Sequence, residues 1–399
     1  MIKLYSLEAS TTEARNAMLA ARDARIPWEM RVPFSSTQGT SGALVTYHSG
    51  HENEDYTANA HLNDVLDELS LAPYTKEGPW AIRQRGLAQW VDVVNPEVCR
   101  RQIDQFEGLG VISNGAPFFW LVDPEDPNIG VAGIGGAGVA YYIAQAQSEL
   151  GMTYAEAIED YETTRKAILS GIPTAMRAYR PRGAYALYGG PIAPFEDLCY
   201  TANEPATVAQ SYPGVSPTQT KRQEVVRQNN ALLPVYQKYN ALFVVGYHNG
   251  AAGKNPAQAM LAGEAATPQV HAGYDAICAE AARVSAACQR PWVFGTQPGY
   301  EGTNNPGVRL RAMGHADRLA QTLYAASYGA SGMLAYERHD HTFNPNDSTE
   351  GFTPVVTAAD VLEQTLIGFR RLQQYWLRPE FDALAHARRY QLGLPTLVL

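Results

Sequence analysis

Short apolar runs and longer segments of helical periodicity alternate along this chain, most regularly in its second half. Apolar runs of about four to eight residues predict buried strands, and apolar positions that recur about every 3.6 residues predict helices. The strands predicted in the second half are 183–188, 241–247, 291–295 and 332–336. The helices predicted there are 219–239, 274–288, 308–328 and 357–376. This alternation is typical of a parallel sheet covered by helices.

The first half is harder to divide, but it shows the same alternation. The patterns predict strands at 2–7, 43–48 and 117–122, and helices at 13–25, 61–71, 96–106, 137–150 and 154–179. About seven or eight such units favour an α/β fold of the TIM type, a closed (β/α) barrel of seven or eight parallel strands ringed by helices, over an open doubly wound sheet. We expect one large barrel domain over residues 1–399, and a small N-terminal appendage before about residue 75 stays open. Residues 390–399 are expected to form an extra strand or an extended tail.

Composition and charge narrow the classes of partner. Of the 399 residues, 45% are hydrophobic and 18% are charged, which is typical of a soluble globular protein with a substantial core. The net charge is −9 and no basic run is present, so we expect no nucleic-acid partner. No apolar stretch approaches the roughly 20 residues that span a bilayer, so we expect no membrane partner. The N-terminus is polar too soon for a signal peptide, which predicts synthesis in the cytoplasm, with cell lysis or carriage on a particle as routes of release.

Two carboxylates follow the predicted strand 117–122, which runs directly into Asp123-Pro124-Glu125. Side chains two residues apart on a strand point to the same face, so Asp123 and Glu125 are expected to share one. In a (β/α) barrel the catalytic groups lie where strands end, and two acids there suit acid/base work on a sugar or an ester. The alternative interpretation is a proline-bounded acidic turn on the surface.

Tyrosines end or follow three later strands. Tyr188 ends one strand and is followed by a loop that reaches Tyr200, Tyr247 ends the next, and Tyr336 and Glu337 come at the last. Tyrosine combines an apolar face with a hydroxyl, which suits sugar-binding surfaces, although tyrosines also line contacts between helices and sheets. We take these five residues as candidate substrate-binding residues.

Four landmarks resemble the hyaluronidases, and they come in that family's order over about residues 110–340. Residues 178–191 and 197–200 look like the family's Arg-Pro-Arg-Gly turn, the strand after it and the Pro-Asp-Cys-Tyr-Asn loop. Residues 230–247 are similar to its Ala-Leu-Tyr-Pro-Ser-Ile-Tyr strand, and residues 329–336 to its Gly-Ala-(Ala/Ser)-Gly-Val-Val-Leu-Trp strand. Residues 121–125 resemble its Val-Ile-Asp-Trp-Glu motif. Pro124 and Tyr336 stand where the family has tryptophan.

The resemblance implies a glycosidase that cleaves an N-acetylhexosamine-containing polysaccharide by a retaining mechanism, assisted by the substrate's own 2-acetamido group. Glu125 would protonate the glycosidic oxygen and later activate water, and Asp123 would orient the acetamido nitrogen. This is a recognised exception to the scheme with two catalytic carboxylates. The charge of Asp123 would help to raise the pKa of Glu125 towards the working pH. Tyr200 and Tyr247 would support the sugar by hydrogen bonds, and Tyr336 would supply a stacking wall.

Two other functions stay open. If Glu337 faces inward, Glu125 and Glu337 would be the acid and the nucleophile of an ordinary retaining glycosidase, with carboxyl groups about 5–5.5 Å apart. Strand alternation allows only one of Tyr336 and Glu337 to face inward, and we prefer Tyr336. The second alternative is a barrel without turnover, which binds glycan or serves as a structural component of a larger assembly.

A glycine-rich motif and three histidines are candidates for a cofactor site and a metal site. Residues 133–138 fit GxGxxG, but a dinucleotide site needs a strand that runs directly into the glycines, and residues 126–128 are predicted to form a turn. We therefore expect a βα loop there and no cofactor. His248, His339 and His341 would suit zinc, but histidines in polar loops are more often solvated, and we expect no metal. The cysteines form no CxxC pair and are expected to be free thiols: Cys99, Cys199, Cys278 and Cys288.

Overall fold

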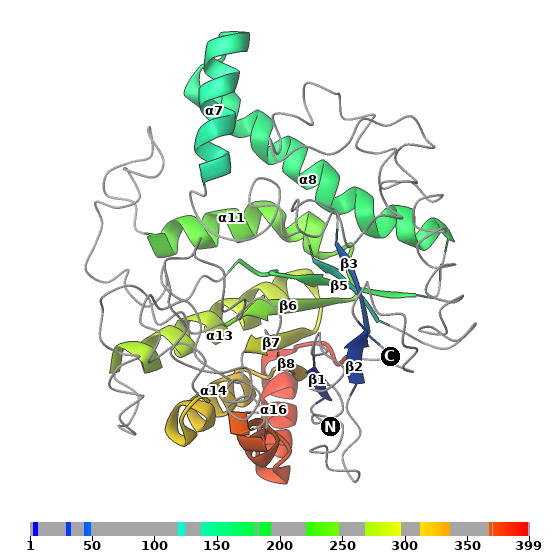
Figure 1. Ribbon diagram of the computed structural model, residues 1–399, viewed down its shortest axis with the longest axis vertical. Coiled ribbons are helices and arrows are strands. Elements are labelled where there is room, and N and C mark those ends of the chain that lie inside the picture. Colours follow the sequence, from blue (N-terminus) through cyan, green and yellow to red (C-terminus); the bar gives the residue numbers. More distant parts are fainter. Residues whose placement is uncertain are drawn as a thin grey trace, which may run out of the picture. The chain divides into compact units, whose positions relative to one another are not determined.

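The structure is a computed structural model of the chain (Figure 1). It describes residues 3–6, 29–32, 44–48, 119–123, 137–179, 181, 183–192, 221–246, 268–296, 312–335, 367–368 and 370–397. The contacts within the chain define two compact units. Unit 1 comprises Met1–Pro33, Ala193–Tyr200 and Phe243–Leu397. Unit 2 comprises Phe34–Ile192, Thr201–Leu242 and Val398–Leu399.

Unit 1 contains a parallel sheet in the order β7, β8, β1, β2. Its strands are β7 (Trp292–Thr296), β8 (Gly332–Ala335), β1 (Lys3–Ser6) and β2 (Glu29–Val32). The first strand of the chain is thus the neighbour of the last described one, with Lys3 opposite Gly332. The backbone N–H of Gly246 donates to the carbonyl of Gly295 at 2.8 Å, so the end of β6 (Ala241–Val245) lies beside β7.

Three helices of unit 1 are α13 (Pro268–Cys288), α14 (His315–Ser327) and α16 (Pro379–Leu392) (Figure 1). Helix α13 packs on β7 and α14, and α14 packs on α16 through Ala326, Ala385 and Phe381. The buried core combines strand and helix side chains, among them Ile277, Ala281, Val293, Phe294, Ala325 and Leu334. This is the parallel sheet with covering helices that the alternating pattern predicts.

Of the two alternatives for the C-terminal residues 390–399, the extra strand is wrong. Residues 390–392 belong to α16 and residues 394–397 have no regular structure, so no described residue of 390–399 forms a strand. The boundary signals of α16 are present in the sequence: Pro379 stands at its start, and Gly393 follows its end with φ +61°. A glycine in that left-handed conformation is a usual helix stop. Arg389 also fixes the helix, because its Nη1 donates to the carbonyl of Ala330 at 2.6 Å.

Unit 2 contains a second parallel sheet, with β4 (Phe119–Asp123) between β3 (Leu44–His48) and β5 (Ala184–Tyr188). Its helices are α7 (Ala137–Leu150), α8 (Tyr154–Tyr179) and α11 (Lys221–Tyr236), and α8 contacts both α7 and α11. The buried residues come from both layers, among them Leu169, Ile172, Met176, Ala186, Leu187, Val225 and Leu232.

Helix α8 continues through Pro173, although proline has no N–H to donate to the carbonyl four residues earlier. That carbonyl belongs to Leu169, and the hydroxyl of Tyr239 donates to it at 2.7 Å. Burial raises the pKa of Tyr239, which keeps the hydroxyl protonated as a donor. A tertiary hydrogen bond therefore replaces the one that Pro173 removes, and the 26-residue helix stays continuous.

Within the described residues the predicted elements agree with the observed ones except at some boundaries and at the C-terminus, where α16 was not predicted. The helix predicted at 154–179 coincides with α8, whereas α13 begins earlier than residue 274 and α14 later than residue 308. Strand β2, with the polar sequence Glu-Met-Arg-Val, was not predicted because it has no apolar run. The helices predicted at 13–25, 61–71 and 96–106 lie outside the described residues.

Candidate functional site

Two candidate residues end neighbouring strands of unit 2. Asp123 is the last residue of β4, and Tyr188 is the last residue of β5. Val122 pairs with Leu187, so the next residues along the two parallel strands are Asp123 and Tyr188. The carboxyl ends of β4 and β5 therefore bring these two residues to one edge of the sheet.

His48 lies on the other side of Asp123 at the same edge. It is the last residue of β3, and the strand register pairs it with Asp123. The sequence interpretation predicted the strand 43–48 but did not select His48 as a candidate. The criterion that selected Asp123, a polar residue at the end of an apolar run, would also have found it. This edge therefore holds one more residue of a type that enzymes use for proton transfer.

The Tyr188 side chain is buried, with 8% of its surface exposed. It continues the buried run of Tyr185, Ala186 and Leu187 along β5. Gly189 follows with φ +77°, which turns the chain sharply at the end of the strand. Tyr188 is therefore held as part of the strand end, and its ring is not an open stacking surface.

The remaining candidates lie outside the described residues. They are Glu125, Tyr200, Tyr247, Tyr336, Glu337, His248, His339 and His341. The strands that precede three of them are confirmed, since β6 ends at Val245, two residues before Tyr247, and β8 ends at Ala335, next to Tyr336 and Glu337. Their side-chain positions stay predictions.

A buried polar network surrounds the carboxyl end of β7 in unit 1, and the sequence interpretation missed it. We call it the β7 cluster; its members are Tyr274, Thr296, Asp317, Arg318 and Gln321, each at most 2% exposed. Arg318 Nη1 donates to Thr296 Oγ1 and to Gln321 Oε1, both at 2.9 Å. Gln321 Nε2 donates to the Tyr274 hydroxyl at 3.1 Å, and that hydroxyl donates to Asp317 Oδ1 at 2.7 Å.

The hydrogen bonds of the β7 cluster hold the end of a strand in place. Thr296 is the last residue of β7, and its hydroxyl also donates to Gln321 Oε1 at 2.7 Å. Burial, followed by the charge of Asp317, raises the pKa of Tyr274, so its hydroxyl remains a donor. The sequence signal is the occurrence of Asp317, Arg318 and Gln321 among the alanines of α14, which would otherwise form a plain apolar face.

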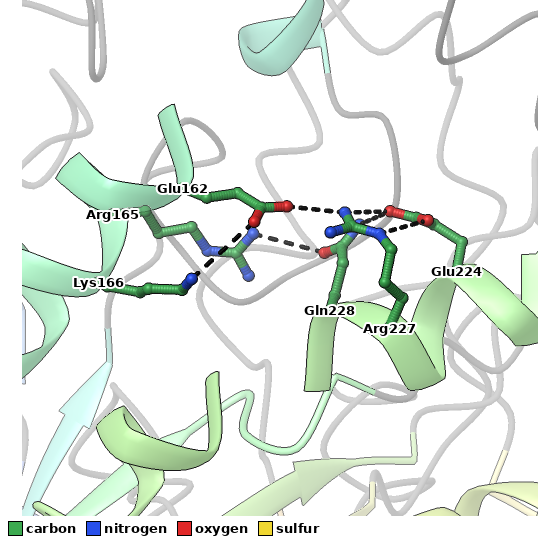
Figure 2. Close-up of polar contacts among 6 residues, drawn as sticks. All are labelled: Glu162, Arg165, Lys166, Glu224, Arg227 and Gln228. Atoms are coloured by element: carbon green, nitrogen blue, oxygen red, sulfur yellow. Dashed lines mark hydrogen bonds and ion pairs between the residues drawn. The ribbon is translucent and has the colours of Figure 1, made fainter. Parts of the chain in front are cut away.

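A second polar network links two helices of unit 2 (Figure 2). We call it the α8–α11 cluster; its members are Glu162, Arg165 and Lys166 on α8, and Glu224, Arg227 and Gln228 on α11. Arg227 donates to both oxygens of Glu224, at 2.9 and 2.6 Å, and its Nη2 lies 2.7 Å from Glu162 Oε1. The hydrogen bond with Glu224 raises the pKa of Arg227 further. These residues connect helices and belong to no strand end.

The described residues offer no metal site and no membrane span. No group of three His, Cys, Asp or Glu side chains among them could hold a metal ion, and no described helix is long and apolar enough to cross a bilayer. Cys278 and Cys288 are buried free thiols, as predicted, and burial raises the pKa of Cys288 to about 11. Cys99 and Cys199 lie outside the described residues.

The glycine-rich motif at 133–138 does not follow β4 directly. Strand β4 ends at Asp123, residues 124–132 separate it from the first glycine, and α7 begins inside the motif at Ala137. In a dinucleotide-binding turn the strand runs straight into the glycines. The β4 strand therefore does not supply that arrangement.

Comparisons with known proteins gave matches to solved structures alone. No family model and no curated protein matches this chain. A crystal structure of bee venom hyaluronidase superimposes with a TM-score of 0.45 and 14% identity, over 72% of this chain and 77% of that one. The same enzyme in complex with a hyaluronic acid tetramer gives 0.43 and 13%, over 73% and 78%. A double mutant of Cellulomonas fimi endo-beta-1,4-mannanase gives 0.37 and 12%, over 91% and 74%. At these values the superpositions by themselves assign neither fold nor activity.

Proposed function

We propose that this chain is a glycoside hydrolase of the (β/α) barrel type that cleaves an N-acetylhexosamine-containing polysaccharide with retention, assisted by the substrate's acetamido group. The observation that carries the proposal is the position of Asp123 at the carboxyl end of β4, beside the carboxyl end of β5 at Tyr188. This is the edge where (β/α) barrels hold their catalytic groups. Glu125 follows Asp123 at the two-residue spacing that lets two strand-end acids share a face.

The strand pairings support the barrel part of the proposal. In unit 1 the first strand, β1, pairs with β8, the last described strand, as well as with β2, whereas an open doubly wound sheet leaves its last strand at an edge, away from the first. In unit 2 the Asn240 N–H donates to the Tyr185 carbonyl at 2.6 Å, next to the start of β6, and in unit 1 Gly246 bonds to Gly295 at its end.

In the proposed reaction Glu125 protonates the glycosidic oxygen as the acetamido carbonyl attacks the anomeric carbon. Asp123 accepts a hydrogen bond from the acetamido nitrogen and orients it. Glu125 then removes a proton from the water that opens the resulting ring. In this proposal Tyr200, Tyr247 and Tyr336 contact the sugar.

The test is Glu125→Gln, which keeps the size of the side chain and removes the acid. We expect kcat for release of reducing ends from hyaluronan or a chitin oligosaccharide to fall by about 10³-fold or more, since general acid–base catalysis contributes about 10²–10⁴. The matched control is Glu337→Gln, which should keep kcat within about threefold because the acetamido group, and no second carboxylate, is the nucleophile. Circular dichroism confirms that both variants fold.

The outcomes separate the alternatives. Loss of activity in both variants would instead favour the ordinary retaining mechanism with Glu125 and Glu337. A wild-type protein that binds these glycans but releases no reducing ends would overturn the enzymatic proposal in favour of a glycan-binding barrel.

A further inference from the structure

The side chain of Asn229 holds both backbone groups of a residue just beyond β5. Its Nδ2 donates to the carbonyl of Ile192 at 2.8 Å, and its Oδ1 accepts from the N–H of Ile192 at 2.9 Å. The hydroxyl of Tyr236 donates to the same Oδ1 at 2.8 Å. Asn229 and Tyr236 lie on α11 and are completely buried. We call the two bonds to Ile192 the Asn229 bridge.

The turn between Tyr188 and Ile192 is tightly packed at Gly190. Gly190 and Pro191 are buried. A Cβ atom at Gly190 would lie 2.8 Å from Leu187 Cδ2 and 3.1 Å from Tyr236 Cε1. Because the turn is packed between its own strand and Tyr236, a shift of Ile192 would be transmitted to Tyr188.

A comparable contact exists at the opposite end of β5. Asn240 Oδ1 accepts from the N–H of Tyr185 at 2.9 Å and also from Arg177 Nη2 at 2.9 Å. That contact lies at the start of the strand, away from Asp123 and Tyr188 at its carboxyl end. The chain therefore provides a matched pair of asparagines, one at each end of the same strand.

We infer that Asn229 is a positioning residue of the candidate active site, whose bridge to Ile192 fixes the carboxyl end of β5 and thereby Tyr188 relative to Asp123. The inference rests on the proposed glycosidase function and adds a residue that the sequence interpretation did not select. A buried amide is costly to desolvate and stabilises only when its hydrogen bonds keep their geometry, so it holds the turn in one place. Displacements of about 1 Å at a site can cost up to about 10²-fold in rate, which makes such a constraint functional.

The experiment compares Asn229→Ala with Asn240→Ala. We expect Asn229→Ala to lower kcat/KM for hyaluronan by about tenfold or more, mainly through KM, because the sugar contacts move while the acids of β4 stay in place. The pH profile of kcat should remain that of the wild type for the same reason. Hydrogen exchange at the Ile192 amide, followed by mass spectrometry, should accelerate and so report that the bridge is open.

Asn240→Ala is the control for a merely structural effect. It removes side-chain hydrogen bonds at the amino end of β5, and we expect kcat/KM to stay within about twofold even where Tm falls as much as in Asn229→Ala. If both variants lose kcat/KM equally, Asn229 has no special role. Unchanged kcat/KM in Asn229→Ala with accelerated exchange at Ile192 also overturns the inference.

A milder variant covers a failure of Asn229→Ala to fold. Tyr236→Phe keeps the ring against Gly190 and removes the hydrogen bond to Asn229 Oδ1 and the longer one, 3.4 Å, that the Tyr236 hydroxyl accepts from the Ile192 N–H, so we expect KM to rise about threefold. An unchanged KM overturns the inference. Failure of the proposed function can be told apart from failure of this inference, because in that case the wild-type protein itself releases no reducing ends. The positioning role of Asn229 would then be ruled out as well.

Discussion

The β7 cluster of unit 1 is sealed from solvent, whereas the α8–α11 cluster of unit 2 opens to it at one edge. In the first, every member is at most 2% exposed and the hydrogen bonds run through neutral groups between one arginine and one aspartate. In the second, Arg227 is 44% exposed and joins two carboxylates, of which Glu224 is 1% exposed (Figure 2). Both networks tie helices in place, but only the second can be screened by salt.

The difference in solvent exposure between the two clusters indicates which of them fixes the positions of its residues more tightly. A buried network loses far more when one member is removed than an exposed ion pair does, because water cannot replace the missing partner. The sealed network includes Thr296 at a strand end, the kind of position that carries candidate residues elsewhere in this chain. The open one lies between two helices, where small adjustments are tolerated.

The largest effect is expected from Arg318→Met. The variant removes the donor to Thr296 and Gln321 and the positive charge near Asp317, so we expect the free energy of unfolding to fall by about 3–5 kcal/mol. Urea unfolding followed by tryptophan fluorescence measures it. The control is Leu319→Met at a 38% exposed neighbour on the same helix, which should cost below about 0.5 kcal/mol. A loss in Arg318→Met below about 1 kcal/mol would show that the sealed network adds little.

An intermediate effect is expected from Arg227→Met. Glu224 keeps a hydrogen bond from Gln228 Nε2 but loses both bonds from Arg227, so we expect a loss of about 1–2 kcal/mol. The loss should shrink as salt rises towards about 1 M, where the Debye length is about 3 Å. The control is Lys166→Met, whose Nζ lies 4.0 Å from Glu162 and which should cost below about 0.5 kcal/mol. A salt-independent loss would contradict the contrast between the two clusters.

The smallest effect is expected at the exposed start of α8, where Thr153 and Glu156 form a capping box. Glu156 Oε2 accepts from the backbone N–H of Thr153 at 2.7 Å and from its hydroxyl at 2.8 Å, and these bonds lower the pKa of Glu156. A lowered pKa means that the stabilisation is present above the unfolded-state pKa of about 4.3 and is lost as the pH falls through the lower folded value. Glu156→Ala should therefore lower Tm slightly near pH 7 and by less near pH 3. A Tm difference that is the same at both pH values would rule out the carboxylate as its source.

Much of the local structure follows from neighbouring residues. Helix α8 coincides with its predicted bounds because its periodic face extends from Tyr154 to Tyr179, and Gly151 ends the helix before it. Helix α16 could also have been found, since Pro379 and Gly393 mark its ends. Strand β2 could not, because its four residues carry no apolar pattern and only pairing with β1 makes them a strand.

The candidate site was predictable only in part. Asp123 and Tyr188 were selected as strand-end residues, and the described sheet brings the ends of their strands together. Asn229 was not selectable, because its partner Ile192 is 37 residues away and an asparagine inside a helix carries no local sign of such a contact. The β7 cluster has the same character, with hydrogen bonds that join residues 22 to 47 positions apart.

The sequence by itself determined most of the described strands and helices and which polar residues come at the ends of the predicted strands, because periodicity and boundary residues act over a few positions. Only the tertiary structure decided that β1 pairs with β8, that His48 stands opposite Asp123, and that Asn229 holds Ile192. These pairings depend on which distant surfaces become buried together, and many arrangements of the same elements satisfy the local pattern. The register of a parallel sheet and the partners of a buried amide are fixed only when the whole chain packs.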